Sequence, residues 1–283
     1  MKKKLLISFS GGRTSAFMCW WIWTNYKDIY DIVVVFANTG KEAEGTLKFI
    51  HEFQINFGIP IVWVEYRAGS EKGWKVNPKI VDFYTASRNG EPFEEMISRM
   101  GIPSTEVPFC STVLKNRTIK AYLRTIKFKK YYTAIGIRSD EVDRVSVHYL
   151  RDKINYPLIS SKHWEYIETT KPEIIDWWLT QHFDLNIHDD EGNCDNCWKK
   201  NTSLLVRNYR RNPASFDWWT KMQDRYGLFN PRNTKLNPPF NFYRGNRSTH
   251  DIAALSRLSD EKVKELTKNE KISGCSESCE PFK

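Results

Sequence analysis

The sequence predicts an α/β protein with a doubly wound, mostly parallel sheet, followed by a smaller helical, cysteine-rich C-terminal region. Apolar, β-prone runs alternate with helical patterns in the first half of the chain, which is typical of open α/β sheets. The run DIVVVFA at 31–37 is continuously apolar, as expected for a strand covered on both faces. After about residue 182 the chain is rich in Asn, Arg, Trp and Cys, with few strand-like runs.

The same patterns predict the individual elements in order. Strands are expected at Lys4–Phe9, Asp31–Ala37, Ile59–Tyr66 and Tyr131–Ile137, and helices at Ala16–Asn25, Thr46–Phe57 and Pro172–Phe183. Residues 67–108, with scattered Gly and Pro, are expected to form an irregular insertion over the site. We therefore expect an α/β domain at 1–181 and a metal-organised C-terminal region at 182–283, with ligands bound at the carboxyl ends of the strands.

Composition restricts the class of partner and the compartment. A chain of 283 residues with 40% hydrophobic content can bury a full core without disulfides. Its formal net charge of +9 favours anionic partners, although surplus Lys and Arg also serve solubility. The apolar stretch after the N-terminal Met-Lys-Lys-Lys is too short for a signal peptide, and no run is long enough to span a bilayer. We expect a cytoplasmic protein without a membrane partner.

The stretch ISFSGGRTSAFM, residues 7–18, carries the first functional motif. A serine, two glycines, an arginine and two further hydroxyls separate a predicted strand from a predicted helix. Consecutive glycines let backbone N–H groups converge on an anion, and the helix adds the positive end of its dipole. The alternative is a plain tight turn. The position of the motif between strand and helix favours a phosphate site.

This motif resembles the pyrophosphate-binding PP-loop, SGGxDS, of the N-type ATP pyrophosphatase and phosphoadenosine phosphosulfate (PAPS) reductase superfamily. It lacks the GxxxxGK[ST] spacing of a Walker loop. Three later stretches resemble further family motifs in the right order, and together the four cover about the first 150 residues: Asn38-Thr39-Gly40, Phe109-Cys110-Ser111 with Lys115, and Gly136-Ile137-Arg138 with Arg144. The pieces GNCDNC, YRGN and GCSESCE resemble a PAPS-reductase-like branch found in bacterial and phage genomes.

The resemblance implies an adenine nucleotide, ATP or PAPS, held by backbone donors, hydroxyls and arginines. The implied nucleotide-binding residues are Ser10, Gly11, Gly12, Arg13, Thr14, Ser15, Asn38, Thr39, Gly40, Gly136, Arg138 and Arg144. Arg138, directly after a strand and a glycine, is also expected to take part in catalysis. Thr14 and Asn38 stand where the family has Asp, so carboxylates that would position Mg²⁺ are missing there. Asp140, Glu141 or Glu42 are candidates to replace them.

The cysteines allow three kinds of chemistry. In adenylyl-sulfate reductases a mid-chain cysteine pair and a later CxxC hold an iron-sulfur cluster. By that resemblance Cys110, Cys194 and Cys197 would hold a [4Fe–4S] cluster, with Cys275 or Cys279 as fourth ligand or with one iron left open. The alternative is a structural zinc held by Cys194, Cys197, Cys275 and Cys279.

A third use of the cysteines is nucleophilic. In PAPS reductases a cysteine on a C-terminal tail attacks the sulfate sulfur, a role that Cys279 would take here, and Cys110 is a second catalytic candidate. His182 and His188 can replace a thiolate ligand but are more simply surface residues, and Cys19 is expected to be a buried apolar group.

Aromatic and basic residues alternate in the second half of the chain. The aromatic members are Trp177, Trp178, Trp198, Trp218, Trp219 and Tyr243, and the basic ones are Lys199, Lys200, Arg207, Arg210, Arg211 and Arg244. Stacking rings with cations suit a single-stranded nucleic acid. Alternatively, the rings form the core of a small helical region and the charges its wet face.

The sequence thus predicts a PP-loop enzyme that binds an adenine nucleotide and transfers sulfur with the help of a cysteine-bound metal centre. One reaction is adenylation and thiolation of a nucleic acid such as tRNA or DNA, which needs a sulfur donor. A second is reduction of PAPS or adenylyl sulfate to sulfite by a thioredoxin-like reductant. The third alternative is a non-catalytic nucleotide- or nucleic-acid-binding protein with structural zinc.

Overall fold

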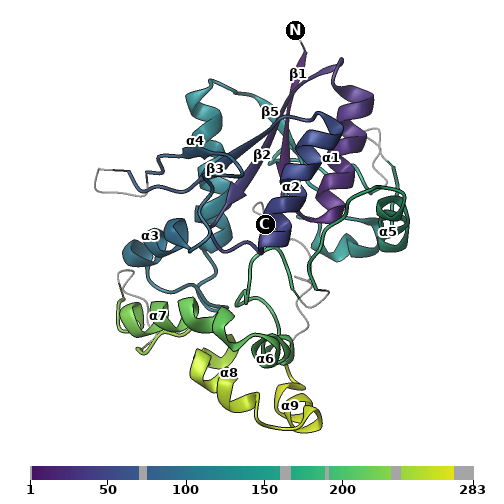
Figure 1. The fold of residues 1–283 in the computed structure, drawn as a ribbon. Coiled ribbons are helices and arrows are strands. Elements are labelled where there is room, and N and C mark those ends of the chain that lie inside the picture. The colour runs from purple at the N-terminus through teal and green to yellow at the C-terminus, as the bar shows by residue number, and fades with distance from the viewer. Residues whose placement is uncertain (1, 70–74, 160–166, 189–190, 231–236, 271–283) are drawn as a thin grey trace.

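A six-stranded sheet forms the centre of the molecule (Figure 1). The structure, a computed structural model, describes residues 2–69, 75–159, 167–188, 191–230 and 237–270. The strand order is β4-β3-β2-β1-β5-β6, and every neighbouring pair is parallel except β3 and β4. The strands are β1 Lys3–Phe9, β2 Tyr30–Asn38, β3 Ile61–Glu65, β4 Lys79–Val81, β5 Tyr131–Ala134 and β6 Ile154–Asn155. The predicted α/β class with a mostly parallel sheet is confirmed.

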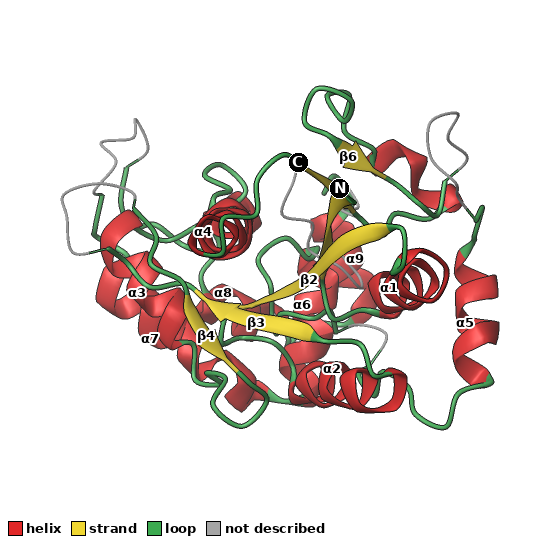
Figure 2. Cartoon of the chain, turned by 90° about the horizontal axis from the view of Figure 1, so that it is seen from above, coloured by secondary structure: helices red, strands yellow, loops and turns green. Residues whose placement is uncertain are grey.

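Helices cover both faces of this sheet. Seen from above in Figure 2, α1 (Arg13–Tyr26) and α2 (Glu44–Phe57) lie on one side of β2 and β3, and α4 (Thr118–Thr125) lies on the other. Helix α5 (Lys171–Leu179) packs outside α1. The doubly wound arrangement follows from right-handed crossovers between parallel strands, which place consecutive helices on opposite faces when the direction of winding reverses.

Side chains of β1 alternate between the two layers, as the strand period of two requires. Leu5, Ile7 and Phe9 belong to the core under α1, α2 and α5. Leu6 belongs to the core under α4, with Ile119 and other residues of that helix. All four β1 side chains are at most 2% exposed, so this strand is covered on both faces and its carboxyl end emerges between two layers of helices.

The segment 67–108 is more regular than its composition predicts. It contains β4 and the helix α3, Glu91–Met100, so the prediction of an irregular insertion is wrong for these residues. Helix α3 places Phe93, Met96 and Ile97 on one buried side, the spacing of an amphipathic helix. Pro92 at its start is tolerated because the first helical turn has no intrahelical bond to lose.

The C-terminal helices share a second core with α3 and with the π-helix η1, Ser111–Arg117. They are α6 Thr202–Arg211, α7 Asp217–Tyr226, α8 Thr249–Leu255 and α9 Asp260–Thr267, joined by the 3₁₀ turns η3 Pro213–Phe216 and η4 Arg244–Asn246; a further turn, η2, is Ser139–Arg144. Figure 1 shows α6, α8 and α9 at the end of the molecule opposite the N-terminus. Within the described ranges, no helix has both the length and the apolarity needed to cross a bilayer.

Trp178 joins three helices and offers a test of this packing. It is 1% exposed, lies edge-on to Phe49 at 4.8 Å between ring centroids, and donates from Nε1 to the carbonyl of Arg13 at 3.1 Å. We expect Trp178→Ala to lower the free energy of unfolding by about 3 to 5 kcal/mol. The control is Leu179→Ala on the same helix, 74% exposed, which should cost less than about 0.5 kcal/mol. Urea unfolding measures both, and equal losses would contradict this packing.

Candidate functional site

The loop between β1 and α1 presents backbone groups and hydroxyls at the carboxyl edge of the sheet. Gly11 has φ +85°, which L side chains rarely adopt, and an added Cβ would lie 2.7 Å from Thr46 Cγ2. Ser15 Oγ accepts from the N–H of Ser10 at 3.2 Å and donates to the carbonyl of Gly12 at 2.9 Å. No side chain caps the first turn of α1 in the described structure. Hydrogen bonds within the loop fix its conformation, most of it is buried, and anion binding by its backbone stays a prediction.

Arg13 holds a different partner from the one predicted. Its guanidinium makes a bidentate pair with Asp184, with Nε 2.7 Å from Oδ1 and Nη2 2.9 Å from Oδ2, and donates to the carbonyl of Leu185 at 2.8 Å. This charge-assisted pair ties the chain after α5 to the start of α1. The described contacts therefore give Arg13 a positioning role, and direct contact with a phosphate stays a prediction.

The loop after β5 packs directly against the first turn of α1. A Cβ on Gly136 would lie 3.2 Å from Ser15 Cα and 3.3 Å from the carbonyl oxygen of Thr14, so glycine permits this close approach. Arg138 is 7% exposed, and its Nη1 donates to Thr14 Oγ1 at 3.2 Å. Thr14, which stands at the Asp position of the PP-loop motif that the sequence resembles, thus receives a hydrogen bond from Arg138.

Two carboxylates hold the arginines of this loop. Asp140 makes a bidentate pair with Arg138, with Oδ1 2.9 Å from Nε, and this hydrogen bond lowers the pKa of Asp140. Glu141 pairs with Arg138 at 3.3 Å and with Arg144. Both carboxylates are therefore engaged with guanidinium groups, which argues against the suggestion that they replace the missing Mg²⁺ ligands.

The turn after β2 explains why this chain has Asn at position 38. Asn38 Nδ2 donates to Glu65 Oε1 at 2.7 Å and to the carbonyl of Ser87 at 2.9 Å, while Oδ1 accepts from the N–H of Gly40. Asn38 and Glu65 are both fully buried. An Asp at 38 would place two carboxylates in contact, so the buried glutamate requires an amide there.

A short antiparallel bridge brings the CxxC to this turn. Glu42 pairs with Cys194, the N–H of Ala43 donates to the carbonyl of Asn193 at 2.9 Å, and the N–H of Asp195 donates to the carbonyl of Lys41 at 2.7 Å. Lys41 Nζ also lies 3.0 Å from Asp195 Oδ2, and Asn193 Nδ2 donates to the carbonyl of Ser10 at 2.7 Å. The segment 193–195 therefore contacts both the first loop and the second.

Three of the predicted cysteines meet beside this bridge. Cys110, Cys194 and Cys197 line one small cavity of about 20 Å³, together with Thr39, Lys115 and the rings of Phe93, Trp198 and Trp219. A hydrogen bond with Cys197 and burial raise the pKa of Cys194 well above its ordinary value of 9.0. The thiol of Cys194 is therefore less readily ionised than an ordinary cysteine, and a bound cation would favour its thiolate.

Glu42 adds a buried carboxylate next to the thiols. Its Oε2 accepts from the N–H and Oγ1 of Thr39, both at 2.8 Å, and its Oε1 lies 3.7 Å from Lys115 Nζ. Burial raises the pKa of Glu42, while Lys115 and the Thr39 hydrogen bonds lower it. Glu42 thus fixes the Thr39 turn rather than facing open solvent.

The predicted metal centre is only partly assembled by the described residues. Cys275 and Cys279, including the predicted tail nucleophile, lie outside the described residues. Among the described side chains, no three of His, Cys, Asp or Glu form a group able to hold a metal ion. A [4Fe–4S] cluster or a zinc ion therefore stays a prediction. His182 and His188 are exposed, with the His182 ring 2.8 Å from Asn56 Oδ1, and Cys19 is fully buried, as expected.

Most of the C-terminal tryptophans belong to the core. Trp178, Trp198, Trp219 and Tyr243 are at most 3% exposed, and Lys200 is 1% exposed. Stacking on nucleic acid bases is therefore wrong for these rings. The alternative of a small helical core is confirmed for Trp198, Trp219 and Tyr243, whereas Trp178 belongs to the core under α1, α2 and α5. Trp218 is half-buried, with Lys41 Nζ 5.1 Å from its ring centroid.

Several polar residues of the site have no signal in the sequence. Glu65, Asp184 and Asn193 contact the predicted loops from elsewhere in the chain, and Lys41, directly after Gly40, pairs with Asp195. Glu65 is the last residue of a strand, directly at the carboxyl edge, which is the one local feature that points to it. Asp195 lies between the two cysteines of CDNC, and that motif predicts a role for the cysteines but none for Asp195.

The Asn38–Glu65 pair can be tested by charge exchange. We expect Asn38→Asp to lower the free energy of unfolding by about 3 kcal/mol or more, since two buried carboxylates would then face each other. Adding Glu65→Gln removes the repulsion and should recover part of the loss. Chemical denaturation at neutral pH measures both variants. A wild-type value for Asn38→Asp alone would contradict this explanation of position 38.

Glu42 predicts a dependence of stability on pH. The unfolded chain has a Glu pKa near 4.5 and the folded chain a higher one, so the folded state binds the extra proton between the two values. The quantity compared is the free energy of unfolding of the wild type minus that of Glu42→Gln. This difference should not vary with pH below 4.5, and it should fall as pH rises from 4.5 through the folded pKa of Glu42. Urea midpoints across pH measure this. The exposed Glu52→Gln is the control, and a pH-independent difference for Glu42→Gln would contradict the prediction.

Comparison with known proteins finds relatives without an assigned function. The chain is 29% identical over 302 residues to an uncharacterized nin region protein of Escherichia phage lambda, across 98% of this chain and 94% of that protein. Two uncharacterized proteins of Methanocaldococcus jannaschii are each 28% identical over 53% and 50% of this chain, which spans only 28% and 24% of their lengths. No protein-family model matches the chain. The phage relative is therefore similar over both the sheet and the C-terminal helices.

Proposed function

We propose that the chain has the PP-loop fold and binds an adenine nucleotide between the loops that follow β1 and β5. The supporting observation is the strand order. The chain winds from β1 to β2 and β3 in one direction, then crosses to β5 and β6 on the other side of β1. The switch point between β1 and β5 is where open α/β sheets bind ligands. The glycine loop at 10–12 and Arg138 stand on its two sides.

The geometry of the two loops supports an anionic ligand. The start of the 14-residue helix α1 has no side-chain cap in the described structure, so its N–H groups suit phosphoryl oxygens. Arg138 contributes a buried positive charge whose direction is fixed by Asp140. Thr14 Oγ1 accepts a hydrogen bond from Arg138, and Ser15 Oγ donates one to the carbonyl of Gly12. These bonds keep the first turn of α1 in place.

The thiols beside Thr39 support a sulfur-related reaction. Cys110, Cys194 and Cys197 line one cavity that also contains Thr39 of the turn after β2. We propose that the nucleotide activates an acceptor by adenylation and that these cysteines serve the sulfur transfer, with a nucleic acid as acceptor. Reduction of PAPS or adenylyl sulfate is the second candidate, which the proximity of Cys110 to the site favours.

Gly136→Ala tests the proposed nucleotide site. Its Cβ would meet backbone of Ser15 and Thr14 at 3.2 to 3.3 Å, so the two loops must separate. We expect the affinity for ATP or PAPS to fall about tenfold to a hundredfold. The control is Gly58→Ala, which also adds a methyl group, at φ +62°, but into open space far from the loops. Isothermal titration measures both variants.

Product analysis of the wild type separates the candidate reactions. AMP and pyrophosphate formed with a tRNA or DNA acceptor and a sulfur donor would support adenylation and thiolation. Sulfite formed in a thioredoxin-coupled assay would identify the reductase instead. Nucleotide binding without turnover would favour the binding protein, and absence of any ATP or PAPS binding would overturn the proposal.

A further inference from the structure

The amino edge of the sheet is strongly basic. Parallel strands β1, β2, β5 and β6 all begin there, and the pairing of Lys4 with both Asp31 and Tyr131 places their first residues side by side. The segments 2–4, 26–31, 124–132 and 151–154 at this edge carry ten Lys and Arg residues against three Asp. We call these four segments the basic edge. It holds seven of the nine net positive charges of the whole chain.

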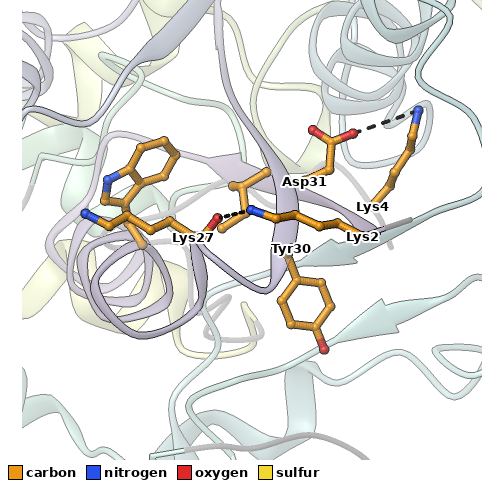
Figure 3. Close-up of a pocket in the computed structure, with 7 residues that line it drawn as sticks. Lys2, Lys4, Lys27, Tyr30 and Asp31 are labelled. Carbon is orange, nitrogen blue, oxygen red and sulfur yellow. Dashed lines mark hydrogen bonds and ion pairs between the residues drawn. The ribbon is translucent and has the colours of Figure 1, made fainter.

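Most of these charges are available to solvent. Seven exposed lysines span the basic edge: Lys2, Lys3, Lys27, Lys127, Lys129, Lys130 and Lys153. Between β1 and the end of α1 lies an open hollow of about 420 Å³, and three of its seven lining residues are lysines (Figure 3). There Lys2 Nζ donates to the carbonyl of Lys27 at 3.3 Å, and Lys4 Nζ lies 4.0 Å from Asp31 Oδ2. The aromatic rings of Trp23 and Tyr30 form part of the same wall.

Helix dipoles explain only a small part of this charge. The C-termini of α1, α2 and α4 point toward the basic edge, and each carries about half a negative charge. Three helix ends therefore call for about 1.5 positive charges, far fewer than the seven present. Solubility alone would be served as well by lysines spread over the surface. Their concentration at one edge indicates a polyanionic partner.

The backbone of three lysines supports a functional role. Lys127, Lys130 and Lys153 have φ values of +54°, +56° and +55°, in the left-handed region that Gly and Asn adopt more readily. They are three of the five non-glycine residues with positive φ in the described structure. A lysine in this conformation costs about 1 kcal/mol or more, so folding alone would favour Asn or Gly at these turns.

We propose that the basic edge binds the phosphate backbone of a nucleic acid by charge, without reading its bases. Lysine ammonium groups act as point charges toward phosphates. Because they are spread over four segments, they suit a row of phosphates in a polyanion better than a single small ion. Lysines that converge around a hollow suit a convex phosphodiester backbone better than a flat bilayer surface. Tyr132, 39% exposed, lies beside these lysines, with Lys153 Nζ 6.0 Å from its ring centroid.

This surface is separate from the proposed nucleotide site. Strand β1 has seven residues and runs from the basic edge to the loop at Ser10, about 23 Å at 3.3 Å per residue. A short duplex bound along the basic edge is therefore expected to leave the loop open, and the two ligands should bind independently. The inference does not rest on the proposed function.

The test replaces the three left-handed lysines by asparagine, which tolerates this backbone conformation. Lys127→Asn/Lys130→Asn/Lys153→Asn should fold normally. Its affinity for a short fluorescein-labelled duplex DNA should fall about tenfold or more at low salt. The slope of log affinity against log salt should become shallower by about three, since each phosphate contact contributes about 0.9. Fluorescence anisotropy across NaCl concentrations measures both quantities.

A matched control removes the same charge from the opposite end of the molecule. Lys221→Gln/Lys264→Gln/Lys268→Gln changes three exposed lysines of the C-terminal helices and should bind DNA as wild type does. Equal losses in both triple variants, or no loss in the first, would overturn the proposal. Binding to phosphatidylcholine and phosphatidylserine vesicles without DNA binding would overturn it in favour of a membrane surface. Gly136→Ala, the variant that tests the nucleotide site, should bind DNA as wild type does. Loss of nucleotide binding and loss of DNA binding can thus be told apart.

Discussion

The antiparallel bridge between residues 41–43 and 193–195 joins the two halves of the chain at the carboxyl edge of the sheet. It places Cys194 opposite Glu42 and brings Asn193 to the carbonyl of Ser10. Helices α6 to α9 follow directly after this segment and share their core with α3 and η1. Because backbone hydrogen bonds and the Lys41–Asp195 pair fix the segment, the thiols meet the turn after β2 in one arrangement. The candidate site therefore depends on a contact between residues about 150 positions apart in the chain.

Buried charges recur among the loops at the carboxyl edge of the sheet. Glu42, Glu65, Lys115 and Arg138 are each at most 7% exposed. Taking such groups out of water costs more than an ordinary ion pair returns, so they contribute little to net stability. They contribute to specificity instead: each buried charge has a particular donor or acceptor, and only one packing of the loops satisfies all of these pairs. Such arrangements are common at sites where ligands bind, since a polar network without its full set of partners is costly.

Local patterns predict the strands and fail where distant residues decide the outcome. The continuous apolar run of β2 and the strand-loop-helix at β1 were predicted within a few residues, because their hydrophobic patterns are strong. β5 ends at Ala134 rather than Ile137, where the chain turns toward α1 and Gly136 contacts Ser15. Helix α3 was missed because glycines and prolines surround it, and its apolar side is buried by C-terminal helices far along the chain. The partners of Arg13 and Asn38, Asp184 and Glu65, cannot be read from local sequence for the same reason.

The two outer strands are very short, three residues in β4 and two in β6. An outer strand exposes unpaired N–H and C=O groups to which another chain can add, which is how sheets polymerise. Here β4 runs antiparallel along β3 and covers it, and β6 offers almost no length for such addition. The long inner strands β1 and β2 thus have both neighbours supplied from within the chain. Short outer strands therefore limit edge-to-edge association of this sheet. Charged residues in the surrounding loops are not needed for that purpose.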